Sequence, residues 1–132
     1  MSKCIAIIGT RSRDGQADYQ ATRQAFLKIY EPGDTIVSGG CPKGGDRFAE
    51  EIAENLNVPI TIHRPESVLR GSPKWVYAKA FYDRNTLVAQ DADIVIACVE
   101  NEKKPYGGGT GDTIKKFIKK WHGHCHNSLI LV

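Results

Sequence analysis

The residues of this 132-residue chain that could do chemistry are concentrated in three glycine-rich segments. Gly9–Arg13 (GTRSR) carries two arginines, Ser38–Arg47 (SGGCPKGGDR) carries an aspartate among four glycines, and Gly107–Thr113 (GGGTGDT) carries four more glycines. Glycine lets backbone N–H groups approach an anion closely because no Cβ stands in the way. Arginine adds a charged fork that matches the geometry of a phosphate. Together these segments predict a site for an anionic small molecule.

The elements that must position these segments follow from an alternation of short apolar runs and longer amphipathic stretches. The apolar runs are typical of buried strands, and the amphipathic stretches repeat their apolar residues at helical spacing. Strands are expected at Cys4–Ile8, Thr35–Ser38, Val58–Ile62, Asp93–Val99 and Ser128–Val132, and helices at Ala17–Tyr30, Phe48–Leu56, Trp75–Ala89 and Thr113–Trp121.

Strands that alternate with helices indicate βαβ units and a parallel sheet, and right-handed crossovers place helices on both of its faces. The sequence therefore predicts an α/β fold, Rossmann-like and doubly wound, with a mainly parallel five-stranded sheet and helices on both faces. We expect one domain over residues 1–132. In such sheets ligands bind beyond the carboxyl ends of the strands, where the strand order reverses, so the three glycine-rich segments should meet there.

Composition narrows the class of protein. A net charge of +3 is too weak to indicate duplex DNA binding, and the cationic stretch Lys115–Lys120 has the spacing of a solvated helix face. No apolar stretch approaches the roughly 20 residues that span a bilayer, so no membrane association is predicted. Four cysteines without a CxxC pair, and a strand-like start in place of a signal peptide, favour a reduced protein in the cytoplasm.

A second group of reactive side chains lies near the end of the chain. His122, His124, Cys125 and His126 are of metal-ligand types, but neighbours spaced so tightly cannot easily all reach one ion. A polar turn is the favoured interpretation, and we expect neither a bound metal nor a resident cofactor.

Three other residues have two interpretations each. Asp46 could cap the second helix, accept a hydrogen bond from a ribose hydroxyl, or do both. Trp75 and Tyr77 could stack on a base, although packing of the third helix on the sheet is favoured.

The glycine-rich segments match neither the GK[ST] of a Walker A loop nor the GxGxxG of the dinucleotide-binding fold.

The order of the motifs resembles the SLOG superfamily, which includes the DNA-processing protein DprA and the cytokinin-activating LOG enzymes. The nearest likeness is to its YspA-like, cpYpsA-related branch, and it runs from about residue 4 to the end of the chain. It rests on Gly9-Thr10-Arg11, Ser38-Gly39-Gly40 with Gly44-Gly45-Asp46, Arg84-Asn85 with Asp91-Ala92-Asp93, and Gly109-Thr110-Gly111-Asp112-Thr113.

The resemblance implies a domain that binds, senses or sequesters a nucleotide or nucleotide-derived ligand, such as an NAD- or ADP-ribose-type signal. Proteins of this superfamily are linked to bacterial conflict systems and to phage, and they commonly form homo-oligomers through helices that flank the sheet. The expected ligand-binding residues are Gly9, Thr10, Arg11, Ser38, Gly39, Gly40, Gly44, Gly45, Asp46, Arg84, Asn85, Gly108, Gly109 and Thr110.

Two other classes of function stay open. LOG enzymes use a glutamate of the motif PGGxGTxxE, with an arginine, to cleave an N-glycosidic bond. The matching position here is Thr113, and the acidic Asp112 is one residue away. This departure favours binding over hydrolysis; a hydrolase would draw on Arg84, Asp112 and Asp46. The third class is a structural subunit whose glycines only make tight turns.

Overall fold

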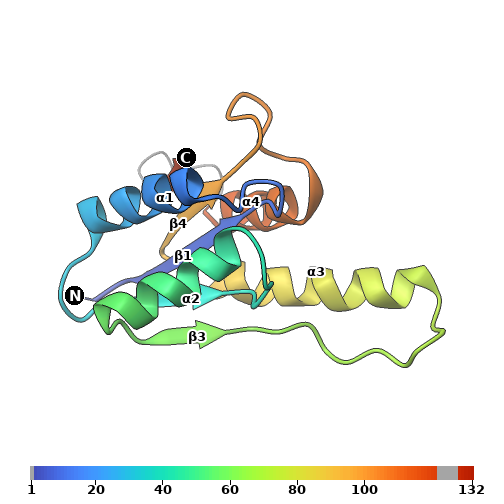
Figure 1. The fold of residues 1–132 in the computed structure, drawn as a ribbon. Coiled ribbons are helices and arrows are strands. Elements are labelled where there is room, and N and C mark those ends of the chain that lie inside the picture. Colours follow the sequence, from blue (N-terminus) through green and yellow to red (C-terminus); the bar gives the residue numbers. More distant parts are fainter. Residues whose placement is uncertain (1, 122–127) are drawn as a thin grey trace.

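The chain folds into strands and helices in the predicted alternation (Figure 1). The computed structural model describes residues 2–121 and 128–132. Its elements are β1 (Cys4–Gly9), α1 (Gln16–Ile29), β2 (Thr35–Ser38), α2 (Gly45–Leu56), β3 (Ile60–Ile62), α3 (Lys74–Asp91), β4 (Ile94–Cys98), α4 (Gly108–Lys120) and β5 (Leu129–Leu131).

The five strands form one sheet in the order β3-β2-β1-β4-β5, and every neighbouring pair is parallel. This confirms the predicted α/β, Rossmann-like fold. From the central strand β1 the chain builds outward through β2 and β3, and it then returns to add β4 and β5 on the other side. The strand order therefore reverses between β1 and β4, and a ligand is expected beyond their carboxyl ends.

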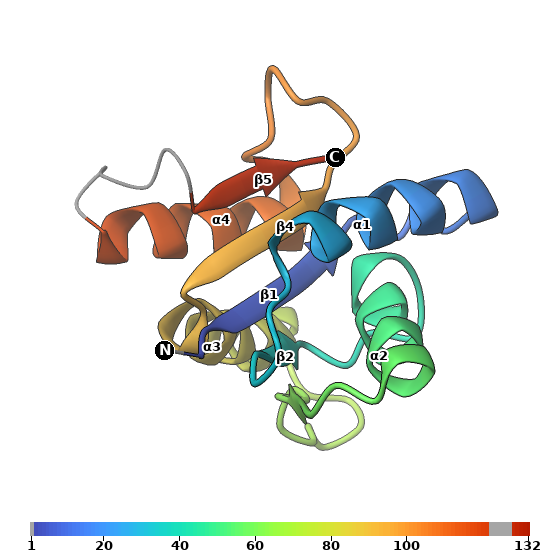
Figure 2. The same cartoon turned by 90° about the vertical axis from the view of Figure 1, so that its left-hand side faces the viewer.

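Alternate residues of β1 explain why both faces of the sheet are covered. Ile5 and Ile7 pack with Phe48 in the cluster under α1 and α2. Ala6 and Ile8 belong to the opposite cluster, which α3 and α4 cover. Figure 2 shows the sheet between the two pairs of helices. The residues of β1 point alternately to the two faces, so a fully apolar strand needs helices on both sides.

Helix α4 begins five residues earlier than the sequence predicts, at Gly108 instead of Thr113. Glycine disfavours helix, so the glycine-rich segment predicts a loop. In the structure the Gly111 N–H already donates to the Gly107 carbonyl at 3.0 Å, which closes a first turn in which Gly108 has a φ of +66°. Gly108, Gly109 and Thr110 therefore lie at the N-terminus of a helix.

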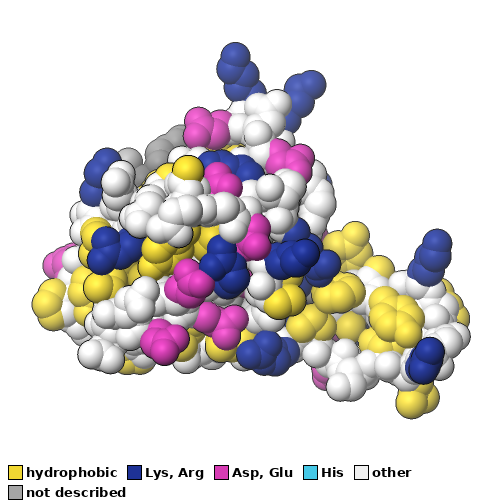
Figure 3. Space-filling model, viewed as in Figure 1, with side chains coloured by type: hydrophobic (Ala, Val, Ile, Leu, Met, Phe, Trp, Pro, Cys, Tyr) yellow, Lys and Arg dark blue, Asp and Glu magenta, His cyan; other side chains and the backbone are white. Residues whose placement is uncertain are grey.

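Helix α3 carries the largest departure from the expected packing. Its N-terminal half extends past the sheet, together with the segment that leads into it (Figure 1). Trp75 is 69% exposed and Tyr77 37%, so the expectation that they pack α3 on the sheet is wrong. Apolar side chains gather on this projection in Figure 3. The physical reason is that this half of the helix has no strand beneath it to pack against.

The prediction about the membrane can be compared with the structure, whereas the prediction about a metal cannot. Across residues 2–121 and 128–132, no helix has the length and apolar character to cross a membrane. The cluster of His122, His124, Cys125 and His126 lies outside the described residues. A cytoplasmic location and the extent of the domain stay predictions.

Candidate ligand-binding site

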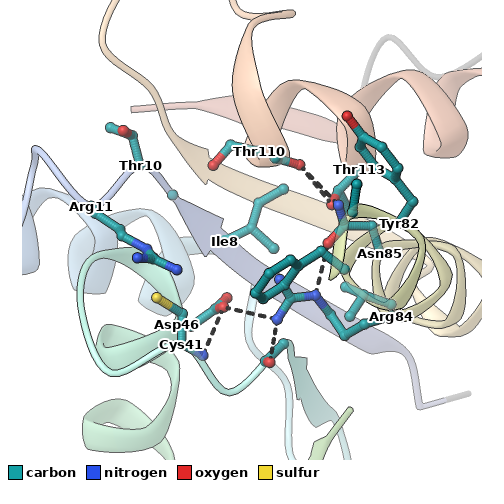
Figure 4. A pocket seen from close by; sticks show the side chains of 16 residues that line it. Ile8, Thr10, Arg11, Cys41, Asp46, Tyr82, Arg84, Asn85, Thr110 and Thr113 are labelled. Atoms are coloured by element: carbon teal, nitrogen blue, oxygen red, sulfur yellow. Dashed lines mark hydrogen bonds and ion pairs between the residues drawn. The ribbon is translucent and has the colours of Figure 1, made fainter. Parts of the chain in front are cut away.

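A cavity of about 510 Å³ lies where the strand order reverses. Its walls come from the segment after β1, the segment after β2, one face of α3 and the first turn of α4 (Figure 4). This volume lies within the usual range for small-molecule sites, roughly 300–1,000 Å³. The predicted site residues that line it are Gly9, Thr10, Arg11, Gly39, Asp46, Arg84, Asn85, Gly109 and Thr110.

Six other predicted residues are not part of this lining, namely Ser38, Gly40, Gly44, Gly45, Gly108 and Asp112. The Gly44 N–H, which was expected to face a phosphate, donates instead to Asp14 Oδ1 at 2.7 Å. At Gly45 a Cβ would overlap backbone atoms of Ile8 and Gly9. Close packing of α2 on β1 therefore accounts for Gly45, and a turn with φ of +72° accounts for Gly44.

Arg84 is held in the cavity wall by the backbone and by its neighbour in sequence. Its Nε donates to Asn85 Oδ1 at 2.8 Å, and its Nη1 donates to the Gly39 carbonyl. The same Nη1 lies 3.9 Å from Asp46 Oδ2. Four of the predicted residues are thus joined in one contact network that links α3 to the segment after β2.

Asn85 extends this network to α4. It is buried, and its Nδ2 donates to Asp112 Oδ2 at 3.1 Å and to the Gly109 carbonyl at 3.4 Å. Asp112 also accepts from Lys116 Nζ at 2.9 Å. Because these contacts hold the Asp112 carboxylate against α3, it is a positioning group for Asn85 and not a member of the cavity lining.

Asp46 faces the cavity and does not cap α2. The helix is capped by Gly44 without a side-chain hydrogen bond, and Asp46 lies in the first helical turn with 8% exposure. Its Oδ2 accepts from the Cys41 N–H at 3.0 Å. Burial raises the pKa of the Asp46 carboxyl, and the Cys41 N–H and the Arg84 charge offset part of that rise.

Arg11 is the least constrained charged group of the cavity. Its side chain points toward the cavity in Figure 4. Among the described residues it makes no hydrogen bond and no ion pair, and it is exposed. The cavity thus holds the free guanidinium of Arg11, the guanidinium of Arg84 in its wall, and the carboxyl of Asp46. Burial opposes the ionisation of that carboxyl. That balance suits an anionic ligand.

The sequence interpretation missed the α3 side of the cavity. Ala78, Phe81, Tyr82 and Val88 line it beside Asn85. The signal was available, because these positions recur every three or four residues and therefore share one face of a helix. It was missed because an apolar helix face usually indicates core packing, and because the sequence does not show that α3 extends beyond the sheet.

No family model and no curated protein matches the sequence of this chain. Two solved structures share its fold. The molybdenum cofactor binding protein of the phototrophic bacterium Rippkaea orientalis is 17% identical, with a TM-score of 0.64 over 99% of this chain and 76% of that one. The DNA processing protein A of Helicobacter pylori, described for its single-stranded DNA binding mode, is 20% identical, with a TM-score of 0.61 over 98% of this chain.

These comparisons bear on the fold. The chain spans 64% of the length of the Helicobacter pylori protein, somewhat less than two thirds. At such identities the likeness shows a shared fold and not a shared ligand. Membership of the SLOG superfamily rests on the motifs of the sequence and stays a prediction. The YspA-like branch stays a prediction.

Proposed function

We propose that the cavity binds a nucleotide or nucleotide-derived ligand, with a phosphate between Arg11 and the first turn of α4. The observation that carries this proposal is Gly109. It lines the cavity in helical conformation, and outside its own helix no atom lies within 4 Å of the position that a Cβ would take. Nothing in the described protein requires a glycine there, whereas a ligand approaching the backbone would.

The electrostatics of the α4 N-terminus support the same placement. The first N–H groups of a helix have no intrahelical acceptor, and the helix dipole adds partial positive charge. Such an end is a ready site for a phosphate. The N-cap residue Gly107 provides no side-chain oxygen that would occupy these donors. Arg11 supplies a full positive charge in the same cavity.

Arg84 and Asp46 take complementary parts in this proposal. Arg84 adds positive charge from a fixed position in the wall. Asp46 is expected to accept a hydrogen bond from a ribose hydroxyl, because a carboxylate beside a phosphate would be repelled. A ligand with both a phosphate and a sugar therefore uses both charged groups of the wall.

The direct test is calorimetric titration with AMP, ADP-ribose and NAD. Removing one charged hydrogen bond costs about 1.5–3 kcal/mol, so Arg11→Ala should weaken binding roughly ten- to a hundredfold. Because Arg11 has no partner among the described residues, the free energy of unfolding should not change. Arg70→Ala, which removes an exposed arginine outside the cavity lining, is the matched control. Equal binding by wild type and Arg11→Ala would contradict the proposed phosphate position.

A hydrolase that cleaves an N-glycosidic or phosphate bond is the alternative, and one observation favours it. The cavity contains a carboxyl–arginine pair, Asp46 and Arg84, and burial raises the pKa of Asp46 as in many general acids. The position that LOG enzymes fill with glutamate is Thr113, whose Oγ1 donates to the Gly109 carbonyl. Chromatography of nucleotides incubated with the protein decides between the two: unchanged nucleotide supports binding, and released base or phosphate supports the hydrolase.

The proposal has two consequences beyond the cavity. A protein that binds without turnover suits sensing or sequestering of a nucleotide signal, including in conflict between bacteria and phage. We also propose a homo-oligomer that covers the exposed apolar side chains of the α3 projection, among them Leu69, Trp75 and Tyr77. Sedimentation at micromolar concentration should show a species larger than the 14.6 kDa chain, and a monomer alone would contradict this association.

A further inference from the structure

The cavity has two chemically different sides. The side formed by the segment after β1 and by α4 presents Thr10, Arg11 and Thr110. The side formed by the outer part of α3 presents Ala78 and Phe81. The phosphate and the ribose of the proposed ligand would contact the polar side. No part of the ligand has yet been assigned to the apolar side.

Phe81 is poorly explained as a core residue. It retains 41% of its accessible surface although it lines a cavity, and it belongs to neither buried apolar cluster. The Cζ of Arg84 lies over the ring, 5.7 Å from its centroid. The guanidinium holds the ring in a defined position by a cation–π contact, and the ring keeps exposed surface in the cavity.

We infer that Phe81 is the stacking platform for the base of the bound nucleotide, and that the ligand class is therefore a base-containing nucleotide and not a sugar phosphate. This inference rests on the proposed function of the cavity, and it adds which class of phosphate-containing ligand the cavity prefers. Stacking on an aromatic ring suits every base, because each base has a flat π face.

The same wall indicates little discrimination between bases. Reading a base edge takes free hydrogen-bonding side chains, and the amide of Asn85 is already engaged by Asp112, Gly109 and Arg84. The α3 residues nearest Phe81 in the lining are Ala78 and Tyr82, of which only Tyr82 has a polar group. AMP and UMP should therefore bind with similar affinity.

The test compares AMP and UMP with ribose 5-phosphate, which has the sugar and the phosphate but no base. Calorimetry would be run on wild type, Phe81→Ala and Phe81→Tyr, with Trp75→Ala as the control for an exposed aromatic residue of α3 outside the cavity lining. We expect AMP to bind about tenfold more tightly than ribose 5-phosphate, and Phe81→Ala to remove that advantage. Phe81→Tyr should restore it, and Trp75→Ala should leave it unchanged.

The outcomes separate this inference from the proposed function. Equal affinity of wild type for AMP and ribose 5-phosphate would overturn the stacking role while the phosphate site stands. The stacking role would also be overturned if Phe81→Ala weakened the binding of AMP and of ribose 5-phosphate equally while the melting temperature stayed unchanged. Failure of all three ligands to bind would overturn both. Tighter binding of AMP and UMP than of ribose 5-phosphate, with that advantage removed in Phe81→Ala and restored in Phe81→Tyr, supports both.

Discussion

Helices α2 and α4 both begin in glycine-rich segments at the same edge of the sheet, and the glycines of the two segments differ in how closely they are packed. At the start of α2, a Cβ on Gly44 would overlap the backbone of Thr10, and one on Gly45 would overlap the backbone of Ile8 and Gly9. At the start of α4, a Cβ on Gly111 would overlap the backbone of Tyr106, whereas one on Gly107 or Gly109 would meet no atom within 4 Å outside the helix.

The difference teaches which glycines serve the fold and which are available to a ligand. Packing of α2 on β1 explains Gly45, and a turn with a φ of +72° beside the backbone of Thr10 explains Gly44, so neither is evidence for a phosphate. Packing explains neither Gly107 nor Gly109, and only Gly109 of these two lines the cavity. The phosphate of the proposed site is therefore better placed at α4 than at α2, although both segments are rich in glycine.

The largest effect expected from this comparison is a loss of stability when Gly45 at the start of α2 is substituted. Gly45→Ala would force a methyl group into the backbone of β1, and overpacking of this kind costs about 1–3 kcal/mol or more. Urea unfolding should show a marked fall in the free energy of unfolding. A variant as stable as wild type would mean that α2 can move away from β1, and the contrast with α4 would be lost.

Asp14 offers a smaller effect on the same segment. Its carboxylate accepts from the Gly44 N–H at 2.7 Å and from Arg47 Nε at 2.8 Å, and these contacts lower the pKa of Asp14. A lowered pKa in the folded protein stabilises it above the pKa of the unfolded chain, and this stabilisation disappears as the pH falls through the folded value. Asp14→Asn should therefore be less stable than wild type at neutral pH, and the difference should vanish in acid. A difference independent of pH would contradict this.

Asp46 should show the opposite dependence. Burial raises its pKa, so the folded protein binds the proton more tightly than the unfolded chain does. The contribution of Asp46 to the stability of wild type should fall as the pH rises from the ordinary aspartate pKa, about 3.9, to the raised value in the fold. Asp46→Asn lacks this loss, so its stability relative to wild type should increase over that interval. Denaturant unfolding at several pH values checks the sign.

The fold could be predicted because its determinants are local. The run Cys4–Ile8 is apolar at every position, which indicates helices on both faces, and alternation of such runs with amphipathic stretches indicates a parallel sheet. The start of α4 could not be predicted, because glycine weighs against helix and only the closed turn between Gly107 and Gly111 shows otherwise.

The site could be predicted in part, for a similar reason. Arg11 and Asp46 lie in segments that follow strands, and this position in the sequence is enough to predict that they reach the cavity. The orientation of Asp112 toward Asn85, and the exposure of Phe81 and Trp75, depend on where α3 lies relative to the sheet. That placement results from packing between distant segments, which no local pattern records.

The most direct test of the α4 site is a pair of measurements on Gly109→Ala. Because a Cβ there meets no atom outside α4, and alanine favours helix over glycine, the substitution should stabilise the protein by about 0.4–1 kcal/mol. The same methyl group would lie in the cavity against the phosphate and should weaken AMP binding. Gly107→Ala, also in open space but outside the cavity lining, should leave AMP binding unchanged. A Gly109→Ala protein that is more stable and binds AMP as wild type does would contradict the account.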